Sequence, residues 1–152
     1  MKQRWGVDAG LVGELSRVAG EVFAAQPAVL AAYLYGSAAR GEPAADLDVA
    51  VLLVASRDHA SCPSSAVLEA MAGDLQRLGA PRGPEIDLRV LNGAAPRFCV
   101  TVLREGKLLY ERDRNLRFAH EARFMSEWAD FRPTWERMRR RMLDRFCGGT
   151  GG

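Results

Sequence analysis

The stretch that decides the fold covers residues 35–54 and reads YGSAARGEPAADLDVAVLLV. A turn of small residues, Gly36 to Gly41, follows the apolar run 29–35, and a second apolar run begins at Leu47. Short apolar runs bounded by glycine and proline are typical of buried strands. We therefore predict strands over 29–35 and 47–54, joined by the turn and by a loop that carries Pro43.

Two acids, Asp46 and Asp48, stand at the mouth of the second strand. Residues two apart on a strand point to the same face, so the two carboxylates lie close together. Carboxylates that close repel each other unless a cation lies between them. Mg²⁺ takes such hard oxygen ligands when substrate phosphates complete its shell. Because a buried strand should not begin with two uncompensated acids, the pair indicates a metal site.

A third acid, Asp87, lies in a segment whose side chains alternate. Residues 85–91 place one set on an apolar face and the other on a polar face: Ile86, Leu88 and Val90 against Glu85, Asp87 and Arg89. This alternation predicts a half-buried strand. If it neighbours the strand of Asp46 and Asp48, the three carboxylates can support two Mg²⁺ ions, one for the attacking oxygen and one for the leaving pyrophosphate. Glu85 shares the face of Asp87, so the identity of the third acid stays open.

The turn after the first strand has the composition of a phosphate-binding loop. Gly36 lets the backbone approach a phosphate closely, and N–H groups at a helix start form an anion seat. Ser37 adds a hydroxyl donor, and Arg40 either contacts phosphate or locks the loop by pairing with an acid. Each feature alone has a plainer interpretation: a turn, a solvated arginine, or the wet face of a sheet. Their order along the chain favours a nucleotide site.

The remaining pattern predicts helices around a small sheet. Helical spacing covers 9–25, with Asp8 as N-cap, then about 67–78 and 95–105, and a short strand covers 107–111. A loop is expected over 58–64. From 113 to 146 the chain is helical, with a break at Arg132-Pro133 because proline disfavours helix in the residue before it. The fold class is α/β (α+β), a small mixed sheet flanked by helices with a C-terminal helical extension.

Length and composition limit the classes of function. The 152 residues predict one domain over 1–147, with its core at about 9–112, C-terminal helices at about 113–146, and a flexible tail over 148–152. A net charge of +2 gives no bulk electrostatic reason to bind nucleic acid or membranes. No apolar run approaches the ~20 residues of a membrane span. We expect no signal peptide and a cytoplasmic location.

Cysteine and histidine are too sparse for a structural zinc site or a disulfide framework. The chain has only Cys62, Cys99 and Cys147, with His59 and His120 as the available imidazoles. The C-terminal segment is unusual in charge, since six arginines between Arg132 and Arg145 face only two acids. This cluster is interpreted as a solvated helix face or as a docking surface for an acidic partner or RNA, and a protein partner is favoured because no glycine-aromatic RNA signature accompanies it. An aromatic stripe that includes Phe124 and Trp128 is interpreted as helix packing or as part of a partner interface.

The spacing of these motifs resembles a known family. Gly36-Ser37, eight residues, Asp46-x-Asp48 and a later strand aspartate, Asp87, are similar to the DNA polymerase β-like nucleotidyltransferase superfamily. The form Gly-Ser-x-x-Arg-Gly over 36–41 resembles the minimal nucleotidyltransferases, or MNT domains. The stretch 104–110, then Phe118, Glu121 and 130–133, is similar to MNT antitoxins that pair with HEPN toxins. The resemblance covers about residues 10 to 140.

The resemblance implies a polymerase-β-like fold and a set of roles. Asp46, Asp48 and Asp87 would bind Mg²⁺, and Asp87 would also help to deprotonate the acceptor hydroxyl. Gly36, Ser37 and Arg40 would hold the ATP phosphates. The resemblance implies transfer of AMP from ATP onto a tyrosine of a HEPN ribonuclease toxin, within a hetero-oligomeric complex, so that the toxin is silenced. The chain departs from the family at Ala45, where serine is usual.

Two other functions remain open at this point. The first is a non-catalytic antitoxin that neutralises its partner by contact, although contact alone needs none of the three aspartates. The second is nucleotidyl transfer onto a small molecule such as an aminoglycoside, although that class usually carries a larger acceptor domain.

Overall fold

The computed structural model describes residues 2–54 and 63–148. The elements along the chain are α1 (Ala9–Ala24), β1 (Val29–Tyr35), β2 (Asp46–Leu53), α2 (Ser65–Gly79), β3 (Glu85–Val90), α3 (Pro96–Glu105), β4 (Lys107–Glu111) and α4 (Arg114–Cys147). His59, Cys62, the predicted tail over 149–152 and most of the loop predicted over 58–64 lie outside the described residues. No helix in the described ranges is both long and apolar enough to cross a bilayer.

The four strands form one mixed sheet in the order β3-β2-β1-β4. β1 is antiparallel to both β2 and β4, whereas β2 and β3 run parallel. A parallel pair needs a crossover connection, and α2 supplies it between β2 and β3. The mixed sheet with flanking helices confirms the predicted fold class, and the pairing of β2 with β3 confirms that the strands of Asp48 and Asp87 are neighbours.

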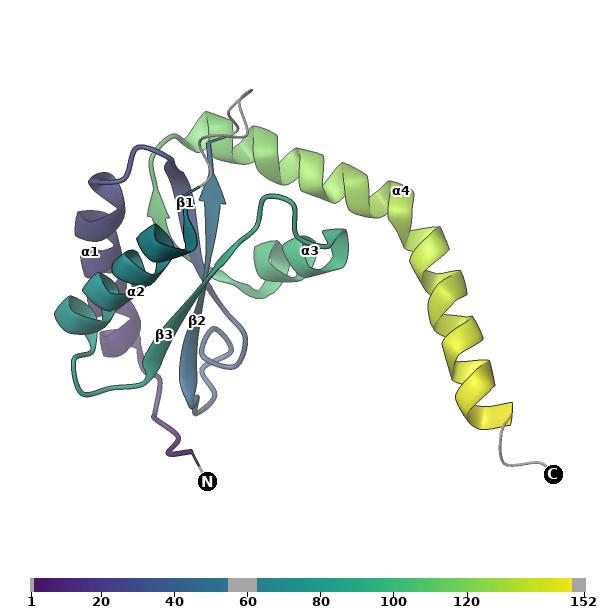
Figure 1. Ribbon diagram of the computed structural model, residues 1–152, viewed down its shortest axis with the longest axis horizontal. Helices are drawn as coiled ribbons and strands as arrows, with labels where there is room; N and C mark the ends of the chain where they lie inside the picture. Colours follow the sequence, from purple (N-terminus) through teal and green to yellow (C-terminus); the bar gives the residue numbers. More distant parts are fainter. Residues whose placement is uncertain (1, 55–62, 149–152) are drawn as a thin grey trace.

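One face of the sheet is covered completely by α1 and α2 (Figure 1). Alternate residues of β2, among them Leu47 and Val49, point into this layer and are fully buried. They pack with Leu15 and Phe23 of α1 and with Leu75 of α2. Asp8 caps α1 as predicted, since its carboxylate accepts a hydrogen bond from the Leu11 amide at 2.8 Å. This layer is the larger of the two apolar cores on the sheet.

The opposite face is covered only over part of its length. Leu52 of β2 packs with Cys99 and Val102 of α3 and with Phe124 of α4. α3 and the first half of α4 lie over this side of the sheet (Figure 1). The start of β2, at Asp46, is only half-buried. The uncovered part of this face is therefore the part that carries the acids.

Ion pairs at the sheet fix the first half of α4. The Tyr33 hydroxyl donates to the Glu121 carboxylate at 2.7 Å. The Arg117 guanidinium lies between two acids and donates to Glu111 and Glu121, each at 2.5 Å. Burial raises the pKa of Tyr33, and the neighbouring Glu121 carboxylate raises it further. A hydroxyl in this setting stays protonated and serves as a permanent donor.

The predicted break at Arg132-Pro133 is wrong, because α4 continues through Pro133 as one helix. Proline removes one amide donor and displaces one carbonyl, which bends a helix without ending it. The helix bends part-way along its length in Figure 1. Stacked aromatic rings span the proline, with the Trp128 and Trp135 ring centroids 5.7 Å apart. These contacts on one side of the helix support its continuation.

Candidate active site

The loop between β1 and β2 consists of hydrogen-bonded turns, which confirms the predicted turn, and the helix start of the anion-seat interpretation does not form there. The Arg40 and Glu42 amides donate to the Ser37 carbonyl at 3.1 and 3.0 Å, and the Gly41 amide donates to the Ala38 carbonyl at 3.1 Å. The chain must reverse here to form the antiparallel pair β1–β2. Pro43, which has no amide donor, follows directly and prevents the turns from continuing as a helix.

Gly36 is required at its position for two separate reasons. Its φ is +73°, which L side chains rarely adopt. A Cβ added to it would also lie 3.0 Å from the Asp48 Oδ2. Gly36 therefore brings the turn directly against the Asp48 carboxylate.

Asp48 lies at the centre of the site. It stands opposite Tyr35 on the antiparallel side and opposite Asp87 on the parallel side. Burial raises the pKa of its carboxyl, and the charges of Asp87 and Asp46 raise it further, against a smaller opposing effect of Arg89. A carboxyl that two other acids influence lies in a cluster of negative charge, and such a cluster attracts a cation.

Asp46 is turned toward the N-terminal segment. Its carboxylate accepts from the Lys2 ammonium at 3.2 Å (Oδ1) and 3.1 Å (Oδ2). Lys2 reaches this place because Trp5 and Ala44 form a two-way backbone bridge at 2.8 and 3.0 Å. Hydrogen bonding to Asp46 raises the pKa of Lys2. A metal ion that binds Asp46 would therefore have to compete with the Lys2 ammonium for the same carboxylate oxygens.

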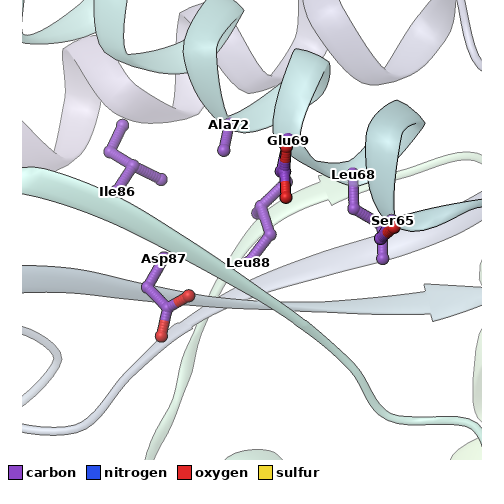
Figure 2. Close-up of a pocket in the computed structure, with 7 residues that line it drawn as sticks. All are labelled: Ser65, Leu68, Glu69, Ala72, Ile86, Asp87 and Leu88. Atoms are coloured by element: carbon purple, nitrogen blue, oxygen red, sulfur yellow. The ribbon is translucent and has the colours of Figure 1, made fainter.

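Asp87 projects from the edge strand β3 on the side away from α2. Figure 2 shows it pointing away from Ala72 and Glu69, whereas Ile86 lies on the α2 side. Asp87 is exposed and also borders a hollow of about 380 Å³ along the α2 edge of β3. Glu85, two residues earlier, pairs in register with Asp46 rather than with Asp48. The register therefore places Asp87, and not Glu85, beside the central acid.

Sequence reasoning missed a cationic and aromatic group next to these acids. The Arg89 guanidinium lies over the Phe98 ring at 4.6 Å from its centroid. Phe98 also meets Tyr35 edge to face, with centroids 5.3 Å apart. Arg89 follows Asp87 by two residues on the same face of β3. The alternation that identified Asp87 could have identified Arg89, whereas the contribution of Phe98 from α3 had no local signal.

Arg40 pairs with acids in this structure, which is the second of the two roles predicted for it; the first was contact with phosphate. Its guanidinium pairs with Glu42 at 3.1 Å and with Glu105 at 3.8 Å. All three side chains are about half exposed, so these pairs contribute little to stability. They hold Arg40 at the outer surface of the turn and link the turn to the end of α3.

The donor set has the chemistry of a Mg²⁺ site without being fully assembled. Within 2–54 and 63–148, no three acidic, histidine or cysteine side chains are gathered closely enough to hold a metal ion. Asp46 is paired with Lys2 instead of facing Asp48 and Asp87. Burial, and after it the charges of Asp87 and Asp46, raise the pKa of Asp48, and Arg89 opposes them only in part. Hard carboxylate oxygens with uncompensated charge fit Mg²⁺.

Comparison with known families supports this arrangement. A family model described as "Polymerase beta, Nucleotidyltransferase" matches residues 19–115, which include β1, the turn and all three acids. The chain belongs to this nucleotidyltransferase family. The match ends at the beginning of α4, so nearly all of that helix lies outside the family model. No curated protein sequence matches the chain at a significant level.

Solved nucleotidyltransferase structures share the fold at low sequence identity. A toxin–antitoxin structure with AMP-PNP matches with a TM-score of 0.64 at 19% identity, over 86% of this chain and 98% of that one. An MNT antitoxin in complex with a tri-AMPylated HEPN toxin from Shewanella oneidensis matches with a TM-score of 0.61 at 18% identity, over 87% and 97%. The toxin–antitoxin pair MntA–HepT gives 0.57 at 18%, over 90% and 97%. These likenesses establish the fold.

Proposed function

We propose that this nucleotidyltransferase moves AMP from ATP onto a hydroxyl in a Mg²⁺-dependent reaction. The observation that carries the proposal is the register of β2 and β3, which sets Asp48 directly opposite Asp87. The Gly36 turn touches the same carboxylate from the other side. A site for phosphates thus adjoins a site for a divalent cation, as phosphoryl and nucleotidyl transfer require.

Each residue of the site has a part in this proposal. The backbone of Gly36, the hydroxyl of Ser37 and the guanidinium of Arg40 would bind the triphosphate. Asp46, Asp48 and Asp87 would hold Mg²⁺. When bound, the metal supplies positive charge that neutralises the phosphates and the leaving pyrophosphate. Asp87, the most exposed of the three acids, accepts the proton of the acceptor hydroxyl.

The ion pair of Lys2 with Asp46 gives this proposal a specific consequence. Asp46 can join the metal site only by leaving the Lys2 ammonium. Lys2 is highly exposed, so its pair with Asp46 is weak and easily exchanged. Removal of the Lys2 charge should therefore lower the Mg²⁺ concentration needed for half-maximal activity.

The acceptor is proposed to be a tyrosine of a HEPN ribonuclease toxin, which the added AMP silences. The support is the shared fold with an MNT antitoxin bound to a tri-AMPylated HEPN toxin. The chain would then act as an antitoxin in a hetero-oligomeric complex in the cytoplasm. Neutralisation by contact alone, or transfer onto a small molecule, are the results that would replace this proposal.

The test combines the purified chain with Mg²⁺, labelled ATP and the product of the neighbouring gene. We expect the label on the partner, with mass increases of AMP size. The Asp46→Ala/Asp48→Ala double variant should transfer nothing. Asp74→Ala, which removes an exposed acid of α2, should transfer normally. Tight partner binding without transfer from any nucleoside triphosphate would contradict catalysis and favour contact-based neutralisation.

A further inference from the structure

The second half of α4 carries an apolar stripe with a seven-residue repeat. Trp128, Phe131, Trp135, Met138 and Met142 follow at alternating spacings of three and four residues. This spacing is the pattern of a helix that packs lengthwise against another helix. Phe146, one turn beyond Met142, extends the stripe. We name Trp135, Met138, Met142 and Phe146 the distal α4 face.

The distal α4 face is open in the structure. Met138 is 50% exposed, Met142 58% and Phe146 78%. This half of the helix extends away from the sheet and its covering helices (Figure 1). A hollow of about 470 Å³ lies along it, between Arg97 of α3 and Phe146. Large apolar side chains gathered in this way are typical of protein-binding surfaces.

Arginines flank the stripe on both sides. In the seven-residue repeat, Arg132 and Arg139 occupy the positions beside one edge of the seam and Arg141 the position beside the other edge. All three side chains are exposed. Arg139 also lies over the Trp135 ring, 5.6 Å from its centroid, so its charge stands at the border of the stripe. Side chains at these positions choose the partner of a paired helix by charge.

Pairing of the face with its own copy leaves Arg139 and Arg141 without a carboxylate. An antiparallel pair of copies would set Arg139 against Arg139. A parallel pair would set Arg132 opposite Glu127, but it would set Arg139 opposite Thr134 and Arg141 opposite Phe146, so that neither of these two arginines of the distal half would meet a carboxylate. A helix with Asp or Glu beside its own apolar stripe satisfies both arginines in either direction.

We propose that the distal α4 face binds an α-helix of another protein, whose apolar stripe is flanked by carboxylates. This inference does not depend on nucleotidyl transfer. The face begins beside α3, because Arg97 of α3 lies over the Trp135 ring at 4.4 Å from its centroid. The next residue of α3, Phe98, contacts Tyr35, which stands opposite Asp48.

The test uses two designed helical peptides of about four heptads, both with leucine along the stripe. One carries Glu at all flanking positions and the other carries Lys. Each repels its own copies, so both remain monomeric. We expect the Glu peptide to bind the full chain at least about tenfold more tightly than the Lys peptide, by fluorescence anisotropy. Met138→Ser/Met142→Ser should weaken the Glu peptide by at least about tenfold.

Charge variants separate a specific seam from general attraction. Arg139→Glu/Arg141→Glu should reverse the preference and favour the Lys peptide. Arg137→Glu/Arg140→Glu makes the same charge change on the outer side of the helix and should preserve the preference for Glu. Circular dichroism of each variant confirms that α4 remains helical.

Several results would overturn the proposal. These are equal binding of both peptides, binding of neither, or reversal by the outer variant as well. A single-stranded RNA oligonucleotide that binds more tightly than the Glu peptide and displaces it would assign the arginines to nucleic acid. A dimer of the chain that Met138→Ser/Met142→Ser abolishes, measured by analytical ultracentrifugation, would assign the face to a second copy.

Discussion

The two faces of the sheet use the same strands for opposite purposes. On the face toward α1 and α2, β2 presents Leu47 and Val49, which are fully buried. On the other face the intervening residues are Asp46 and Asp48, both half-exposed. Because side chains alternate along a strand, the residues of β2 that stabilise the core and the residues of the candidate site are direct neighbours in the sequence. Substitutions at neighbouring positions should therefore have opposite consequences.

The face with the acids is itself divided. Toward the end of β2 it is dry, where Leu52 meets α3 and α4. Toward the start of β2 none of the described helices lies over it, and it collects Asp46, Asp48, Asp87 and Arg89. An acid is tolerated at the start of an apolar strand because water and counter-charges remain within reach. The position of α3 sets the border between the two parts.

The largest effect is expected for Leu47→Ala, between the two acids. Leu47 is fully buried in the covered layer. The cavity should lower the free energy of unfolding by about 2–5 kcal/mol, as measured by urea denaturation. A loss below about 1 kcal/mol would contradict the assignment of this face as the stabilising one.

Gly36→Ala tests the contact between the turn and Asp48. It should lower the free energy of unfolding by about 1–2 kcal/mol through backbone strain, and by more through the clash with the Asp48 carboxylate. Gly41→Ala is the matched control, since Gly41 has the same φ of +73° but nothing within 4 Å of an added Cβ. Nucleotide binding should fall for Gly36→Ala and persist for Gly41→Ala. Equal losses for the two variants would contradict the close approach.

Tyr33→Phe tests how the dry part of the acidic face is held. Loss of the hydroxyl hydrogen bond to Glu121 should lower the free energy of unfolding by about 1 kcal/mol. The double variant Tyr33→Phe/Glu121→Gln should cost less than the sum of the two single variants, because the residues contact each other. Additive losses would mean that the hydrogen bond contributes nothing.

The smallest effect, with the opposite sign, is expected for Asp48→Asn. The pKa of Asp48 is raised in the folded chain above its ordinary value of 3.8. The folded state therefore binds its proton more tightly than the unfolded state, and the wild type loses stability as pH rises from 3.8 through the folded pKa. Above that pKa, Asp48→Asn should be more stable by up to about 1 kcal/mol, since Asp48 is half-exposed. If the difference in unfolding free energy between Asp48→Asn and the wild type were the same at low and neutral pH, the charge of Asp48 would not be destabilising, which would contradict the proposed cluster of acids.

The sequence predicted the four strands along the chain and singled out the three acids because both follow from local patterns, whereas the order of the strands in the sheet was left open. Alternation along 85–91 defined the exposed face of β3, and parallel pairing with β2 then brought Asp87 to Asp48. The pair of Lys2 with Asp46 had no such signal, because it depends on a bridge between Trp5 and Ala44 that no local pattern encodes.

Two misjudged elements have a common physical cause. The anion seat at Gly36-Ser37 was interpreted as a helix start, and α4 was expected to break at Pro133. In both places contacts outside the local preference outweighed it: the antiparallel return of β2 in the first case, and the ring contacts of Trp128 with Phe131 and Trp135 along the same helix in the second. Arg89 was missed although it follows from the same alternation as Asp87.

The most direct test of the account compares Asp87→Asn with Glu85→Gln, two neighbours on the same face of β3. The rate of AMP transfer from labelled ATP is measured with Mg²⁺ and the acceptor protein in excess. Asp87→Asn should lower the rate by at least about 10²-fold, because it removes both the carboxylate that pairs with Asp48 and the proposed base for the acceptor hydroxyl. Glu85→Gln should retain the wild-type rate within about threefold, since charge changes outside the reacting centre act weakly. An active Asp87→Asn variant, or an inactive Glu85→Gln variant, would contradict the assignment of Asp48 and Asp87 as the catalytic pair.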